Sequence, residues 1–185
     1  MILYFSTTGN CKYVATKISQ ATNDKIISIE DCIKKGNYNF TDNCIGIISP
    51  TYFWALPSIT REFLQKVKLQ ADYLYYVATY GTSPGASDFY AEKFLGKKLN
   101  ASFSVRMPDT WTPFFDLSTP EKIAGFSKST ESEIKSIIEH LQQKDCGHFM
   151  DNSKSKMTTK IAYSLYESMR KTKVHGQYTN PNVKI

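Results

Sequence analysis

Short apolar runs alternate with amphipathic stretches over most of this chain. The apolar runs have the length of buried strands and lie at 1–5, 25–29, 43–49, 73–80 and 99–106. The amphipathic stretches place apolar residues at helical spacing and lie at about 12–20, 57–67, 86–97 and 119–144. Residues 30–42 are polar and irregular, and 107–118 have the composition of a long ordered loop. The pattern therefore predicts five strands that alternate with helices.

Alternation of strands and helices is typical of the α/β class. We predict a doubly wound five-stranded parallel sheet with helices on both faces and the strand order 2-1-3-4-5. The third run, 43–49, is apolar almost throughout, as a parallel strand buried on both faces requires. We expect residues 1–145 to form this domain and 146–185 to form a basic C-terminal helical tail.

The tail contains one stretch of helical periodicity, over 160–170. Its apolar face consists of Ile161, Leu165, Tyr166 and Met169. Such a helix can dock on the body of the protein, bind a partner or lie on a membrane surface. We expect docking, and we expect residues 177–185 to be a disordered or linker segment.

The formal net charge of +6 is concentrated late in the chain. Residues 151–185 hold seven lysine and arginine residues against two acidic ones, so the first 150 residues are nearly neutral. A lopsided tail gives no reason to expect the body to bind nucleic acid. No apolar run approaches the ~20 residues that span a bilayer, and the first residues lack the features of a signal peptide. We therefore expect a cytoplasmic protein without a transmembrane segment.

The cysteines and histidines are scattered rather than clustered. Cys11, Cys32, Cys44 and Cys146 form no C-x-x-C pair, so no metal site is expected. Cys11 lies at a predicted helix N-terminus, where the pKa of a thiol can be lowered, but we expect it to fill a Ser or Thr position of the turn. The three histidines have no partner pattern that makes one a base or a ligand, and we assign no catalytic residue.

The most distinctive segments of the chain follow the first, third and fourth strands. They are Ser6–Cys11, Pro50–Pro57 and Thr79–Gly85. Ligands of doubly wound sheets bind outside the carboxyl ends of the strands, where the strand order reverses. These three loops are therefore expected to line one pocket.

The first loop has the chemistry of a phosphate site. Its residues, between a strand and a helix, are Ser6, Thr7, Thr8, Gly9, Asn10 and Cys11. A helix N-terminus offers unpaired N–H donors and a partial positive charge. Because the loop contains no Lys or Arg, it suits one terminal phosphate of a small cofactor better than a triphosphate with its metal.

The other two loops offer aromatic walls. The second contributes Pro50, Thr51, Tyr52, Phe53 and Trp54, and the third contributes Thr79, Tyr80, Gly81 and Gly85. The aromatic residues of the second loop can also be plain core residues, but their place between two prolines at the end of a strand favours contact with a cofactor. A phosphate cradle beside aromatic walls matches flavin mononucleotide (FMN), a flat ring with a phosphate tail.

These segments also carry a resemblance to a known family. Residues 4–10 resemble the phosphate-binding signature of flavodoxins, and the loops at 50–57 and 79–85 are similar to their two flavin-stacking loops. The resemblance covers about residues 1–145 and extends to 105–109. It is closest to the flavodoxin half of proteins that join a flavodoxin domain to a bacterial-type ferredoxin domain. It implies that the first loop holds the phosphate of FMN, and that Tyr52 or Trp54 and Tyr80 flank the ring.

The resemblance implies an FMN-binding electron carrier, with three departures from the family pattern. The chain lacks the clustered cysteines of a ferredoxin half, so an iron–sulfur partner would be a separate protein. Cys11 stands where the family usually has Ser or Thr, and the net charge is positive where many flavodoxins are acidic. Two other functions remain open: an FMN-dependent NAD(P)H:quinone or azo reductase, and a binding module that has lost its flavin.

Overall fold

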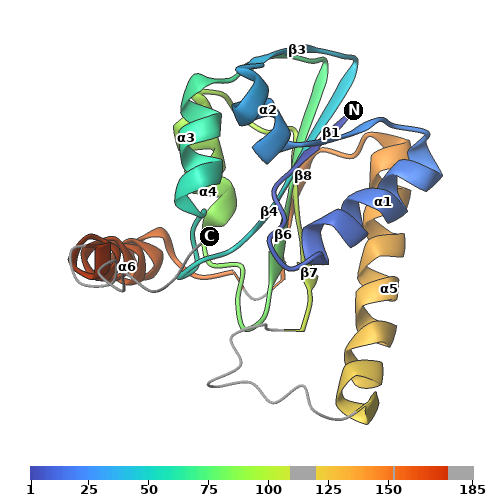
Figure 1. Cartoon of the computed structure of the whole chain (residues 1–185). Coiled ribbons are helices and arrows are strands. Elements are labelled where there is room, and N and C mark those ends of the chain that lie inside the picture. Colours follow the sequence, from blue (N-terminus) through green and yellow to red (C-terminus); the bar gives the residue numbers. More distant parts are fainter. Residues whose placement is uncertain (109–119, 152, 175–185) are drawn as a thin grey trace, which may run out of the picture.

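A six-stranded parallel sheet forms the centre of the protein, in the order β2-β1-β4-β6-β7-β8 (Figure 1). The computed structural model describes residues 1–108, 120–151 and 153–174, with no description of the side chains of 120–128 and 170–174. The strands are β1 Ile2–Tyr4, β2 Ile26–Ser28, β4 Cys44–Pro50, β6 Tyr73–Tyr80, β7 Ala101–Arg106 and β8 Gly147–Phe149. The loop expected at 107–118 and the linker expected at 177–185 lie almost entirely outside the described residues.

The predicted class and the predicted order of the first five strands are confirmed, but the predicted strand count is wrong. β8 adds a sixth strand, and it pairs in parallel with β7 through Ala101 and Gly147, Ser102 and His148, and Phe103 and Phe149. The segment has three exposed residues and no apolar run, so its sequence carries no strand signal. The segment is a strand because its backbone pairs with the edge of β7. The division into a domain at 1–145 and a tail at 146–185 stays a prediction.

Helices cover both faces of the sheet (Figure 1). α2 Ile29–Lys35, α3 Ser58–Lys66 and α4 Ser87–Leu95 lie on one face, and α1 Asn10–Thr22 and α5 Pro120–Gln143 on the other. Successive strand residues point to opposite faces, so Leu3 joins the core under α2, α3 and α4, while Ile2 joins the core under α1 and α5. Both faces are buried, which explains the apolar runs of the sequence.

The segment at 30–42 is more regular than its sequence suggested. It contains most of α2 and then β3 Asn39–Thr41, which pairs in parallel with β5 Lys68–Gln70 in a separate two-stranded sheet. The Ser28 side chain caps α2 by accepting a hydrogen bond from the Asp31 N–H at 3.3 Å. Gly36 ends the helix in the left-handed region, with φ of 66°. These capping signals were present in the sequence, but the apolar periodicity of a seven-residue helix is too short to recognise.

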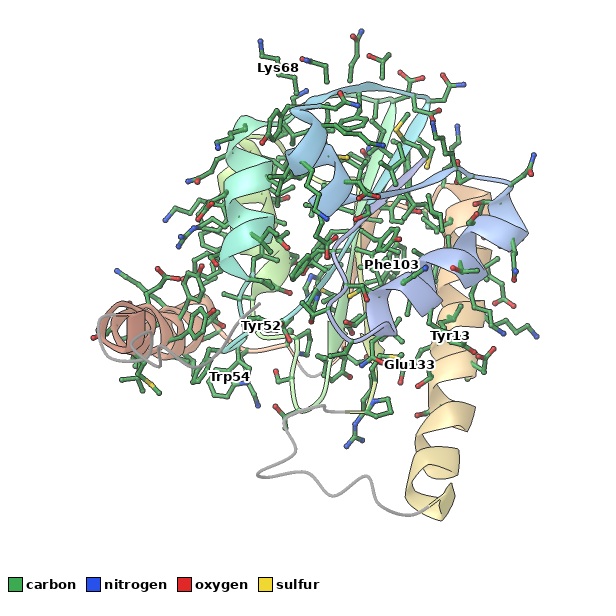
Figure 2. The ribbon with its side chains drawn as sticks, in the orientation of Figure 1. Tyr13, Tyr52, Trp54, Lys68, Phe103 and Glu133 are labelled. Atoms are coloured by element: carbon green, nitrogen blue, oxygen red, sulfur yellow. The ribbon has the colours of Figure 1, made fainter. Side chains whose placement is uncertain are left out.

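α5 holds the end of β7 in place. The Thr130 hydroxyl donates to the Arg106 carbonyl at 2.7 Å, and the Arg106 N–H donates to the Glu133 carboxylate at 2.6 Å. Burial raises the pKa of Glu133, which Figure 2 shows on α5 beside the end of the sheet. These bonds position Met107 and Pro108, which follow β7 directly.

α6 Lys156–Val174 docks beside α3 and α4, as expected for the tail (Figure 1). The Arg61 guanidinium of α3 donates to the Tyr163 hydroxyl at 3.3 Å and lies 3.2 Å from a Glu167 oxygen. The Tyr163 ring packs against Tyr90 of α4, with centroids 5.4 Å apart. Within the described part of the chain, no helix is both long and apolar enough to cross a membrane.

Candidate functional site

The three unusual loops meet at one cavity of about 740 Å³ at the carboxyl ends of β1, β4 and β6. This edge lies next to the point where the strand order reverses, since β1 has β2 on one side and β4 on the other. Thirteen of the fifteen residues predicted for the site line the cavity: Ser6, Thr7, Thr8, Asn10, Cys11, Pro50, Thr51, Tyr52, Phe53, Trp54, Thr79, Tyr80 and Gly81. The exceptions are Gly9 and Gly85, which act through the backbone. The structure therefore brings the predicted loops together.

The first loop turns directly into α1. Gly9 is the N-cap residue, with φ of 95°, a conformation that glycine adopts without steric cost. Having no side chain, Gly9 itself makes no capping hydrogen bond, and the first turn of α1 holds no acidic residue. The Ser6 hydroxyl accepts a hydrogen bond from the Lys12 N–H at 3.2 Å, which folds the loop over the helix end. The N–H donors and hydroxyls of this loop suit an anion such as a phosphate.

Hydrogen bonds join the three loops to one another. The Thr7 and Tyr52 hydroxyls, from the first and second loops, lie 3.4 Å apart. The Thr51 N–H donates to the Thr79 carbonyl at 3.0 Å, which joins the second loop to the third. The Asn10 side chain donates to the Pro108 carbonyl at 3.2 Å. The cavity walls are therefore fixed relative to one another by bonds between distant segments.

Cys11 is a buried, protonated thiol. It is 1% exposed, and its sulfur lies 3.1 Å from the Thr79 hydroxyl. Burial raises the pKa of Cys11 to about 12, and the hydrogen bond with Thr79 only partly offsets this. Desolvation therefore outweighs the helix N-terminus, which by itself favours the thiolate. This buried position is consistent with the expectation that Cys11 fills a Ser or Thr position of the turn.

The second loop is a tight turn with two residues in the left-handed region. Phe53 and Trp54 have φ of 49° and 65°. The turn is closed by two hydrogen bonds between Tyr52 and Ala55, with N···O distances of 3.0 and 3.1 Å. Two successive positive φ values are the mark of a type I′ turn, which usually contains Asn or Gly. The surrounding structure must hold this costly conformation, and it presents the aromatic residues to the cavity.

Gly85 supports the aromatic turn from behind. A Cβ atom on Gly85 would lie 2.1 Å from the Trp54 carbonyl oxygen and 2.2 Å from the Trp54 Cβ. Gly85 also has φ of 63°, and its N–H donates to the Ser83 hydroxyl at 3.1 Å. Gly85 therefore contributes to the site through its contact with the second loop, while its predicted contact with a cofactor stays a prediction. Its backbone packs against Trp54 and so places the aromatic wall.

α6 completes the cavity, which the sequence did not reveal. Ala162, Leu165 and Tyr166 form part of its lining. The Tyr166 ring stacks on Phe53 with centroids 5.1 Å apart and an interplanar angle of 23°, and it meets Tyr52 edge-on at 6.4 Å. Figure 2 shows Tyr52 and Trp54 between the sheet and α6. The spacing of Tyr163 and Tyr166, three residues apart, was the available signal for this packed side.

The sequence missed four further lining residues, Thr82, Ser83, Met107 and Pro108. The face of α6 that was predicted to dock on the body is also wrong. The face that packs on the body contains Thr159, Tyr163 and Tyr166, whereas Ile161, Leu165 and Met169 are 64%, 59% and 43% exposed. Of the predicted apolar face, only Tyr166 turns towards the core.

A second cavity, of about 510 Å³, contains a serine, a histidine and an aspartate. The His148 Nδ1 atom lies 2.9 Å from an Asp88 oxygen and 3.1 Å from the Ser102 hydroxyl. A Ser-His-Asp triad uses one ring nitrogen for the aspartate and the other for the serine. Here the same nitrogen meets both residues, so the cluster does not activate the serine.

The chemistry of the main cavity fits a flat ring with one phosphate. Its volume is typical of a small-molecule site. Hydroxyls, amides and a helix N-terminus lie in the first loop, and the Tyr52, Trp54 and Tyr80 side chains supply aromatic surface. Its described lining contains no Lys, Arg, His, Asp or Glu.

Two solved structures illustrate the similarity of this chain to known proteins. Rubredoxin oxygen:oxidoreductase from Desulfovibrio gigas shares 14% identity, with a TM-score of 0.43 over 76% of this chain and 36% of that one. The chain thus spans about a third of that protein's length. The two-electron reduced flavodoxin of Megasphaera elsdenii shares 16% identity, with a TM-score of 0.41 over 73% of this chain and 99% of that one. With TM-scores below 0.5, these similarities say nothing about the function of this chain.

The family assignment rests on the sequence. A comparison with curated proteins gives no match. The family model described as "Flavodoxin domain" matches residues 1–137, about three quarters of the chain, and includes all three loops of the cavity. The cofactor of this family is FMN, and the residues of the cavity fit it. The protein therefore belongs to the flavodoxin-domain family.

Proposed function

We propose that this protein is an FMN-dependent electron carrier that passes electrons between redox partners. The observation that supports this function best is the uncharged lining of the cavity. Among the described residues that line it, none is a carboxylate, an imidazole, an ammonium or a guanidinium, and the one thiol has a pKa of about 12. The described part of the lining thus offers a flavin no side chain for proton transfer near neutral pH, which suits electron transfer better than proton-coupled turnover of a substrate.

The chain's own residues divide the work of binding. Ser6, Thr7, Thr8 and Asn10 would hold the phosphate with neutral donors, assisted by the N-terminus of α1. Tyr52 or Trp54 and Tyr80 would lie against the ring and exclude water from it. When FMN is bound, its ring supplies the redox chemistry. Aromatic contact, in a lining whose described residues include no cation, disfavours added negative charge on the ring, so we expect a low potential for the second electron.

The partner is proposed to be a redox protein, with a ferredoxin-type iron–sulfur protein as the first candidate. The resemblance of 1–145 to the flavodoxin half of flavodoxin–ferredoxin proteins supports this choice. The cytoplasmic location inferred from the sequence stays a prediction.

A redox titration of the FMN-loaded protein tests the proposal. We expect the purified protein to bind FMN and, under dithionite, to take up its two electrons in separate one-electron steps. A colourless preparation that does not take up added FMN would overturn the proposal. Rapid oxidation of NADH or NADPH by the loaded protein alone, with quinone or azo dye as acceptor, would instead establish the alternative reductase.

A further inference from the structure

α6 carries a second apolar face that no part of the described structure covers. Met157, Ile161, Leu165 and Met169, hereafter the outer stripe, are 75%, 64%, 59% and 43% exposed. They recur every four residues, so they form one ridge along the helix. The opposite side of α6 packs on the body through Thr159, Tyr163 and Tyr166. A continuous exposed row of large apolar side chains is unusual in a monomer and indicates an interaction site.

The part of the chain that carries the outer stripe is basic. Lys160 of α6 is exposed, whereas the exposed Lys156 extends over the Phe89 ring of α4, 4.3 Å from its centroid. Glu167 is the one acidic residue between 153 and 169, and the Arg61 guanidinium lies 3.2 Å from it. The sequence of the following helical turn adds Arg170, Lys171 and Lys173. The net charge of this part of the chain therefore favours an anionic partner.

The shape of the stripe distinguishes between anionic partners. A stable protein interface uses about 20–30 residues on each side and is anchored by Trp, Tyr or Arg. The outer stripe is a single convex ridge of two Met, one Ile and one Leu, and it contains no such anchor. A lipid surface needs no matching groove, because its headgroups and chains rearrange around an inserted helix face. Helices with an apolar stripe and lysines on the polar side bind membranes in this way.

We propose that α6 attaches the protein to a membrane surface rich in anionic lipid. The outer stripe enters the headgroup region, Lys160 contacts lipid phosphates, and the inner face stays on the body. Figure 1 shows α6 at the periphery of the molecule, away from the central sheet, so the body need not obstruct its outer side. Leu165 belongs both to the outer stripe and to the lining of the main cavity. The mouth of that cavity would therefore lie next to the lipid.

Vesicle sedimentation of the full chain tests the proposal without any flavin, so its outcome is independent of the FMN titration. The probes are vesicles of phosphatidylcholine and vesicles of equal parts phosphatidylcholine and phosphatidylglycerol. We expect binding to the mixed vesicles about tenfold or more tighter than to neutral ones, and weakening as salt is added. The double variant Ile161→Ser/Leu165→Ser is expected to lose about tenfold in affinity, and Lys160→Glu about fivefold.

Two control variants make the same kinds of change elsewhere. Tyr13→Ser removes an exposed large side chain from α1, and Lys68→Glu reverses an exposed charge on β5; Figure 2 shows both positions far from α6. Both controls are expected to bind as the unchanged protein does. Circular dichroism and thermal melting establish that each variant is folded. If the double serine variant does not fold, the surface variant Lys160→Glu still decides the question.

Three results would overturn the proposal. The first is absence of binding to the mixed vesicles, and the second is equal loss in α6 variants and controls. The third is a different occupant. Light scattering that shows a dimer abolished by Ile161→Ser would assign the stripe to a second copy. Saturable binding of an acidic ferredoxin at the stripe, without vesicle binding, would assign it to a protein.

Discussion

The two sides of the main cavity are built in different ways. The phosphate side is one contiguous segment, Ser6–Cys11, whose shape follows from a strand, a glycine and a helix start. The aromatic side combines the turn at Tyr52–Ala55 with Tyr166 of α6, more than a hundred residues later. A local site can be recognised in a sequence, whereas a composite one exists only after folding. Variants of each side test whether FMN binding depends on local groups at the phosphate side and on packing between distant segments at the aromatic side.

Gly85→Ala is expected to have the largest effect, because the aromatic side depends on a backbone contact. The added Cβ would lie 2.1 Å from the Trp54 carbonyl oxygen. The left-handed φ costs about 1–2 kcal/mol and the overlap about 1–3 kcal/mol more. Urea unfolding should show the loss, together with changed tryptophan fluorescence and weaker FMN binding.

Gly96→Ala is the matched control for this change. Gly96 has φ of 65°, close to that of Gly85, but a Cβ there meets no atom within 4 Å. It is expected to lose only the conformational part, about 1–2 kcal/mol, and to bind FMN normally. Equal losses in the two variants would show that the contact with Trp54 has no energetic weight.

Tyr166→Ala tests whether α6 belongs to the site. The change removes the ring that stacks on Phe53 and lines the cavity. Aromatic pairs contribute about 0.5–1.5 kcal/mol, so we expect FMN affinity to fall by up to about tenfold. Fluorescence titration of FMN measures this, and Tyr166→Phe, which keeps the ring, should retain most of the affinity. Unchanged binding in the alanine variant would remove α6 from the cofactor site.

Thr8→Ala probes the local side and separates it from the aromatic side. Its exposed hydroxyl lies in the first loop and lines the cavity. Loss of one hydrogen bond to a charged phosphate is expected to weaken FMN binding by about ten- to a hundredfold, since such bonds contribute about 1.5–3 kcal/mol. Riboflavin, which has no phosphate, should bind as before. Thr16→Ala, a change of a half-buried threonine on α1 outside the cavity, is the control, and equal losses for FMN and riboflavin would contradict the assigned role.

The smallest expected effect concerns Cys11, whose thiol is expected to resist alkylation in the folded protein. Because its pKa is about 12, the thiol of the folded protein stays protonated and buried at pH 8. Iodoacetamide should therefore modify the exposed Cys146 long before Cys11, as mass spectrometry can show. The raised pKa also means that stability from the neutral thiol is complete below the unfolded pKa of about 8.5 and falls as the pH rises towards 12. Early labelling of Cys11 would contradict this.

The parts of the fold that were predicted correctly share a long, regular signal. The five apolar runs and the first loop can each be recognised from residues that are adjacent in the sequence. The parts that were missed have short signals or none. α2 has only seven residues, and β8 is an exposed Gly-His-Phe segment that forms a strand because the edge of β7 is free. In the same way, the role of Gly85 depends on Trp54, which lies thirty-one positions earlier.

The sequence by itself determined the doubly wound class, the first five strands and the three loops of the cavity. Hydrophobic periodicity and turn chemistry are local properties, and topology then brings the carboxyl ends of parallel strands together. Only the tertiary structure decided which face of α6 packs on the body. Apolar residues lie on two sides of that helix, and periodicity cannot tell which side meets Arg61, Tyr90 and Phe53. The choice depends on packing between distant segments, which leaves the outer stripe exposed beside the cavity.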